Sequence, residues 1–476
     1  MIPRTSTKKN PPSAAARRLR SRATVAALLA GALSGTGCSL VPRYERPASP
    51  VANRFPGEPE KGPGALASEI AWASFCADEQ LRRLVAVALE SNRDLRIATL
   101  RVEQYQAQYR VTRSSSFPAV TAGGSYSRQR AAGVTSSQWA ASVGATAYEL
   151  DFFGRVRALN EQALETYLAS EEARKTQQIT LVSEVTIQYL ALRHAEAQLQ
   201  LAKDTLATMQ ESLRINQALF DAGAVNELDV RSAEGQVQSA SVSVISSERQ
   251  LAQAEDALVL LLGQPLPSDG SVTLPFPEAT LLAEVPAGLP SDLLERRPDI
   301  LQAEHTLKAA NARIGAARAA FFPTISLTAS AGTASTELTG LLGGGSGNWS
   351  FVPQISVPIF DGGQNQANLD ATRIATRIEV ATYEKTIQTA FREVADALVG
   401  VRTYGDEIEA ERKAIIAQQR RLEVATARYR QGEDAYLNVL SAQRDLYSAQ
   451  QGLLQAQLDR LSSQVSLYKA LGGGWQ

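Results

Sequence analysis

The sequence predicts a mainly α-helical protein, in which very long coiled-coil helices alternate with two β-hairpins suited to the wall of a transmembrane β-barrel. Three observations predict this fold class: an internal duplication, apolar residues at seven-residue spacing, and two uncharged segments of alternating apolar and polar residues. Aromatic residues make up 6% of the 476 residues and there are only 2 histidines. That composition is typical of long helices packed through narrow seams rather than of an enzyme.

The N-terminus has the pattern of an export signal. Residues 1–37 carry seven Lys or Arg side chains and no acid, and an apolar run from Ala23 to Leu33 precedes small residues and Cys38. We expect cleavage before Cys38 and lipidation of its thiol, with palmitate among the attached groups; ordinary signal cleavage nearby is the alternative. Loss of seven positive charges takes the net charge from −1 to −8, which argues against a nucleic-acid partner. Because Cys76 is the only other cysteine, a disulfide framework is excluded.

The sequence after the predicted signal peptide contains an internal duplication of one structural unit. Pro118 and Pro323 correspond at a separation of 205 residues, and Gly154 and Gly363 at a separation of 209. The second copy has therefore gained four residues, all between residues 118 and 154 of the first. The predicted division is a lipidated extended segment, a first repeat, a linker, a second repeat and a C-terminal tail: residues 38–77, 78–263, 264–290, 291–472 and 473–476.

Each copy contains a helical hairpin. Apolar residues recur every seven positions from Val185 to Phe220, and the same ladder returns from Val394 to Tyr429, which is the seam of a coiled coil. A glycine follows each of these two series and can adopt the left-handed conformation that ends a helix, after which a second helix can return. After an opening helix and a β-hairpin, each copy is predicted to hold a long helix and a return helix: 154–220 and 226–262 in the first, 363–429 and 435–471 in the second.

Segments 118–152 and 323–360 are predicted to be β-hairpins. Apolar and polar residues alternate along them, and glycines mark their turns. Between Pro118 and Tyr148 and between Pro323 and Phe360, the only charges are Arg128, Arg130 and Glu337, all close to the predicted turns. Such strands suit a lipid-facing barrel wall, but four of them cannot close a barrel, so several chains must pool their strands. A soluble hairpin at the end of a coiled coil is the alternative.

Several short motifs resemble one known family. They are Val-Pro-Arg-Tyr-Glu-Arg-Pro at 41–47, Trp72 with Phe75, Tyr148 to Gly154, Leu-Glu-Arg-Arg-Pro-Asp-Ile at 294–300 followed by Phe-Phe-Pro, and Pro358 to Gly363. Together they resemble the TolC-like outer-membrane factors, and most closely their lipoprotein branch, the NodT-like outer membrane lipoproteins of tripartite efflux systems. The resemblance covers essentially the whole mature chain.

This resemblance implies a homotrimer whose twelve strands, four per chain, form a transmembrane β-barrel continuous with a periplasmic tunnel of helices. It also implies the function: a passive outer-membrane exit channel for multidrug efflux, lipid-anchored in a Gram-negative cell outer membrane, with most of its mass in the periplasm. The implied partners are a periplasmic adaptor protein, a proton-driven inner-membrane pump and outer-membrane lipid.

The resemblance further implies a gate at the helical tips. A carboxylate at the position of Asp229 would bond the tyrosine at the position of Tyr429 and hold the tunnel shut. Glu433 and Asp434 are candidates for an electronegative mouth, because the positions that often carry acids in the family are Asn438 and Ser441 here. Solvated turn charges are the alternative for Glu433 and Asp434, and simple packing at the end of the apolar ladder is the alternative for Tyr429. The implied adaptor-contacting residues are Gly223, Ala224, Val225 and Gly432.

No catalytic constellation, metal-ligand spacing or cofactor motif is found in the sequence, so we expect neither an enzyme nor a metal or cofactor site. Two other functions remain open at this point. One is a lipid-tethered periplasmic coiled-coil scaffold, and the other is an outer-membrane duct for type I protein secretion. The uncharged hairpins at matching points of the duplication favour a duct over a scaffold.

Overall fold

The structure, a computed structural model, describes residues 39–52, 54–55, 69–266, 293 and 295–475. The predicted signal peptide 1–37, the lipidation site Cys38 and most of the predicted linker lie outside these residues. The chain divides into two compact units. One unit contains residues 39–43, Thr112–Glu161 and Asn311–Thr372, and the other contains the described residues of Tyr44–Val111, Gln162–Ala310 and Arg373–Gln476.

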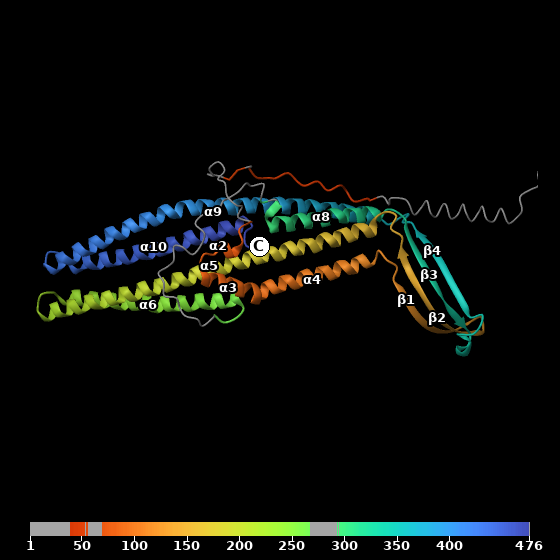
Figure 1. Ribbon diagram of the computed structural model, residues 1–476, viewed down its shortest axis with the longest axis horizontal. Helices are drawn as coiled ribbons and strands as arrows, with labels where there is room; N and C mark the ends of the chain where they lie inside the picture. The colour runs from red at the N-terminus through yellow and green to blue at the C-terminus, as the bar shows by residue number, and fades with distance from the viewer. Residues whose placement is uncertain (1–38, 53, 56–68, 267–292, 294, 476) are drawn as a thin grey trace, which may run out of the picture. The chain divides into compact units, whose positions relative to one another are not determined.

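The first unit holds a four-stranded antiparallel sheet in the order β1-β2-β3-β4, visible as neighbouring arrows in Figure 1. Its strands are β1 (Val120–Ala131), β2 (Val134–Glu149), β3 (Thr324–Ser335) and β4 (Gly347–Ser356). A two-residue turn joins β1 to β2, with φ of 50° at Ala132 and 83° at Gly133, the geometry that matches strand twist in tight hairpins. The longer β3–β4 connection includes a 3₁₀ turn, η2 (Leu338–Gly340). Each predicted hairpin segment thus holds two strands.

The two faces of the sheet differ in chemistry. The strand register sets Val143, Ala331 and Trp349 in one row, and side chains alternate between faces along each strand. One face therefore carries the large apolar groups Tyr126, Trp139, Val143, Leu327, Trp349, Phe351 and Ile355. The opposite face carries hydroxyls, amides and glycines, including Ser127, Gln138, Ser142, Gly144, Ser330, Gly332 and Ser350. Away from Glu149 at the end of β2 and the two arginines near the β1 turn, one face is apolar and the other is polar and uncharged. This is the pattern of a lipid-exposed barrel wall with a polar lumen.

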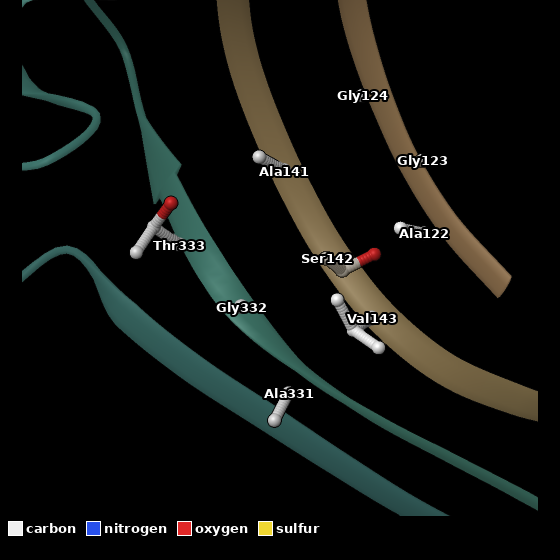
Figure 2. Close-up of a pocket in the computed structure, with 9 residues that line it drawn as sticks. All are labelled: Ala122, Gly123, Gly124, Ala141, Ser142, Val143, Ala331, Gly332 and Thr333. Carbon is white, nitrogen blue, oxygen red and sulfur yellow. The ribbon is translucent and has the colours of Figure 1, made fainter. Parts of the chain in front are cut away.

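Two glycines on the polar face have no room for a side chain. A Cβ at Gly144 would lie 2.4 Å from the Ala329 carbonyl oxygen, and a Cβ at Gly332 would lie 2.1 Å from the Ala141 carbonyl oxygen. Both collisions are with backbone of the neighbouring strand, so the sheet is concave on its polar face at this level. Figure 2 shows the strands bending together here, around a hollow lined by small side chains and glycines.

Helices make up the second unit, and α4, α5, α8 and α9 also contribute residues to the first. The helices are α2 (Trp72–Phe75), α3 (Glu79–Ser91), α4 (Arg93–Ser114), α5 (Arg155–Asp221), α6 (Glu227–Leu262), α8 (Pro298–Ala319), α9 (Gln364–Arg430) and α10 (Tyr436–Ala470). The long helices α5 and α9 have 67 residues each. Their turns into α6 and α10 lie side by side in Figure 1, and hydrogen bonds described below join them. None of the described helices combines the length and apolar character needed to cross a membrane.

The duplication extends to individual contacts in the helical unit. In the first copy the Asn92 side-chain amide donates to the Leu261 carbonyl over 2.8 Å, tying the start of α4 to the end of α6. At the matching positions of the second copy, the Arg297 guanidinium donates to the Ala470 carbonyl over 2.8 Å. Arg297 is buried, and the carboxylates of Asp299 and Glu393 balance its charge. The two joints share their geometry but only the second is ionic.

The segment that follows Cys38 packs along α8. Within the helical unit, the buried Glu304 carboxylate accepts from the Arg46 guanidinium at 2.8 Å and also pairs with Lys308. The Tyr44 hydroxyl donates to the same carboxylate over 3.2 Å. Burial alone would raise the pKa of Glu304, but these cationic and hydrogen-bonding neighbours hold the pKa below its usual value. Residues 44–46 are therefore fixed to the helix by one charged cluster.

Candidate functional site

The candidate site is the pair of turns at which the two helical hairpins reverse direction. The turn after α5 closes with the Gly223 N–H on the Phe220 carbonyl and the Ala224 N–H on the Leu219 carbonyl, both at 2.8 Å. This pair of bonds is a Schellman motif, which satisfies carbonyls left free at a helix end. Gly223 has φ of 74°, and a Cβ there would meet nothing within 4 Å, so the backbone conformation rather than packing requires glycine.

The turn after α9 repeats this motif. The Gly432 N–H bonds the Tyr429 carbonyl at 2.9 Å, and the Glu433 N–H bonds the Arg428 carbonyl at 3.0 Å. Gly432 also has φ of 74° and open space around it. The predicted adaptor-contacting glycines thus shape the two turns, and Ala224 and Val225 follow the first of them.

The starts of the return helices differ between the copies. In the first copy, the Asn226 side-chain oxygen accepts from the Asp229 N–H over 3.0 Å and caps α6. The acids Glu227 and Asp229 in its first turn further suit the positive end of the helix dipole. The matching N-cap of α10 is Ala435, which offers no side-chain bond, and its first turn has no acid. The second turn therefore has less local stabilisation at the start of its return helix.

A polar network joins the two hairpins just inside the turns. The Tyr429 hydroxyl on α9 donates to Asn216 Oδ1 on α5 over 2.5 Å. Asn216 is 1% exposed, and its amide nitrogen donates to the Ser212 carbonyl over 2.9 Å. The Ser212 hydroxyl lies 3.0 Å from the Tyr436 hydroxyl, and the Tyr429 and Tyr436 rings pack with centroids 5.1 Å apart. Small and apolar residues, among them Ala233, Val439 and Ala442, surround this network.

In this network the Tyr429 phenol donates to the Asn216 amide oxygen. The bond between Asp229 and Tyr429 stays a prediction. Asp229 still lies close enough to act through its charge. Burial first, and then the Asp229 carboxylate, raise the pKa of Tyr429 to about 12. The phenol therefore stays a protonated hydrogen-bond donor at physiological pH.

The acids of the second turn do not form a simple negative cluster. Asp434 pairs with Arg428 at 2.7 Å across the turn, so its charge is offset, whereas Glu433 is exposed. Farther along the same hairpin, the Arg421 guanidinium of α9 pairs with Asp445 of α10 and donates to the Ser441 hydroxyl over 3.1 Å.

Sequence reasoning missed Asn216, Arg421, Arg428 and Asp445. The signal that was available for Asn216 is a carboxamide four residues before the last rung of the first ladder, Phe220, where an apolar residue would be expected. Ion pairs across the second hairpin could have been sought because its two helices run antiparallel. No metal-binding group of three or more His, Cys, Asp or Glu side chains occurs among the described residues.

Comparisons with known proteins show which family has this architecture. A protein-family model described as "Outer membrane efflux protein" matches residues 84–264 and 289–473, once for each copy of the duplication. The chain belongs to this family. The family consists of efflux channels rather than enzymes.

Curated relatives and solved structures agree with this assignment. The "Toluene efflux pump outer membrane protein TtgC" of Pseudomonas putida is 48% identical over 92% of this chain and 93% of its own length. The "Outer membrane protein OprJ" of Pseudomonas aeruginosa is 44% identical over 95% of this chain and 96% of its own. The solved outer membrane channel MtrE of Neisseria gonorrhoeae matches with a TM-score of 0.85 and 38% identity, covering 92% of this chain and 99% of MtrE.

The family resemblance, the mainly α fold class with its transmembrane β-barrel strands, and the function as outer-membrane exit channel of an efflux system are therefore confirmed. The protein acts in the outer membrane.

Proposed function

We propose that three copies of this chain form the exit channel, that the Tyr429–Asn216 bond keeps it closed at the helical turns, and that it exports solvents and antibiotics. The sheet carries the argument for several copies. Strands β1 and β4 are its edges, and each leaves a row of backbone N–H and carbonyl groups without a strand partner among the residues that the structure describes. Lipid cannot satisfy these groups, so they must pair with other copies.

Three copies fit the strand count. Four strands per chain give twelve in a trimer, enough to enclose an aqueous path lined by the concave polar face. The apolar face carrying Trp349 and Phe351 would then meet lipid. Lipidation of Cys38 would anchor the mature N-terminus to the same membrane, and residues 44–46 would hold the following segment against α8.

The gate proposal rests on where the buried polar bond lies. Tyr429 and Asn216 connect one hairpin to the other next to their turns, where the least packing is lost when the hairpins separate. The Asp229 charge helps to keep the Tyr429 phenol protonated, and exposed Glu433 contributes negative charge at the mouth while Arg428 offsets Asp434. The turns formed by Gly223, Ala224, Val225 and Gly432 would receive a periplasmic adaptor that links the channel to a proton-driven inner-membrane pump.

The proposed cargo comes from the relatives. Their names refer to toluene, solvents and antibiotics, and this chain is 48% identical to the toluene and solvent proteins over 92% of its length. The test is complementation of a Pseudomonas putida strain that lacks its toluene-efflux channels but keeps their pumps and adaptors. We expect restored tolerance to toluene and antibiotics, and a native mass of three copies in detergent. A monomer that restores neither tolerance would contradict the proposal.

A further inference from the structure

Two arginines on the apolar face of the sheet stand apart from the channel function. Arg128 and Arg130 lie on β1 on the same face as Tyr126, because side chains two and four residues apart along a strand point the same way. The register sets Tyr126 opposite Trp139, with ring centroids 4.4 Å apart. The arginines therefore project from the lipid-facing side of the sheet rather than from its polar side.

The Tyr126–Trp139 pair indicates where the two arginines lie relative to the membrane boundary. Aromatic rings mark the boundary between hydrocarbon and head groups on barrel walls. Arg128 and Arg130 lie beyond Tyr126 by roughly 7 and 14 Å along the strand, at about 3.4 Å per residue. They lie toward the turn at Ala132 and Gly133, at the end of the strands remote from the helices. That end is the outer leaflet if the helices are periplasmic, as they are in the proposed channel.

The two guanidiniums are unpaired and flanked by hydroxyls. Within the described part of the chain neither arginine forms an ion pair, and both are exposed. The register places Ser137 opposite Arg128 and Thr135 opposite Arg130. Within one copy, Glu337 follows β3, and β3 is separated from β1 by β2. Beyond the aromatic boundary their neighbours are lipid head groups, whose anionic groups can balance these two cations.

We propose that Arg128 and Arg130 bind the phosphates of a glycolipid in the outer leaflet, with Ser137 and Thr135 as additional donors and the Tyr126–Trp139 pair against its acyl chains. Guanidinium groups form paired hydrogen bonds to phosphate oxygens, and two of them on one face fit a lipid with sugar-linked phosphates. This inference uses the outer-membrane location and not the gate, so each can fail independently.

The test is binding of diphosphoryl lipid A to the purified full-length protein in detergent, followed by native mass spectrometry. Lipid A from which phosphatase has removed both phosphates should bind the wild-type protein at least roughly tenfold more weakly than intact lipid A. Each charged hydrogen bond that is lost lowers the affinity by about that factor. Inorganic phosphate at the same concentration should not compete, because it lacks acyl chains. Competition by inorganic phosphate would overturn the assignment to a lipid.

The variants test the residues. Arg128→Gln with Arg130→Gln should lower lipid A binding by tenfold or more. The matched control adds Gln129→Arg to Arg128→Gln, which keeps the net charge but turns the cation to the polar face. This control should bind as weakly as the single Arg128→Gln variant. Two results would overturn the proposal. One is equal binding of intact and dephosphorylated lipid A to the wild-type protein, a result that does not depend on any variant folding. The other is full binding by the control variant.

Discussion

Removal of the Tyr429 hydroxyl should open the resting channel. In Tyr429→Phe the ring still packs on Tyr436, but Asn216 Oδ1 loses its donor at a position that is 1% exposed. A lost buried hydrogen bond with one orphaned partner costs about 2 kcal/mol. The cost falls on the closed state alone, because the separated hairpins expose Asn216 to water. If three copies open together the total is about 6 kcal/mol, a shift of roughly four powers of ten in the ratio of open to closed channels.

The assay is the conductance of purified channels in planar bilayers without adaptor or pump. We expect Tyr429→Phe and Asn216→Ala each to raise the open fraction, and the double variant to add little, because both remove one bond. Asp229→Ala should have a smaller effect, since Asp229 acts through charge only. Tyr105→Phe, at an exposed tyrosine on α4, is the control and should match the wild type. Additive effects of Tyr429→Phe and Asn216→Ala, or a larger effect from Asp229→Ala, would refute this account of the gate.

Three further predictions concern charge, packing and pH. Arg428→Gln removes the cation that offsets Asp434, so the channel should become more cation-selective in reversal-potential measurements, and adding Asp434→Asn should cancel the gain. Gly332→Ala places a Cβ 2.1 Å from backbone and should prevent assembly of folded oligomers on semi-native gels, whereas Gly124→Ala, whose nearest atom is 3.7 Å away, should assemble normally. Glu304→Gln should expose residues 44–46 to protease. The folded-state pKa of Glu304 is depressed, so the contribution of Glu304 to stability is present above the unfolded pKa of about 4.3. That contribution is lost as pH falls through the lower folded-state pKa. In the wild type, residues 44–46 should therefore stay protected from protease at about pH 5.

Much of the fold could be predicted because its signals are periodic. The seven-residue ladders gave long helices at 154–220 and 363–429, and the structure has α5 at Arg155–Asp221 and α9 at Gln364–Arg430. Alternation located the strands, and glycines located the turns at Gly223 and Gly432. These features depend on local sequence, so the sequence alone carries them.

The contacts of the site depend on packing that no local pattern records. Whether Tyr429 meets Asp229 or Asn216 is decided by the relative rotation of α5, α6 and α9, which a ladder does not define. The crowding at Gly332 arises from the curvature of the sheet. The register shift between Ala145 and Tyr148 arises from a bulge, in which Ala147 has φ of 52°. Both features follow from how strands bend together rather than from their residues in isolation.

Single-channel recording of the purified wild-type protein in planar bilayers tests the central claim most directly. In the proposed channel, several chains pool their strands into a closed barrel around a polar path. We therefore expect discrete, reproducible conductance steps from a species that needs detergent to stay in solution. A silent bilayer together with a monomer that is freely soluble without detergent would contradict it.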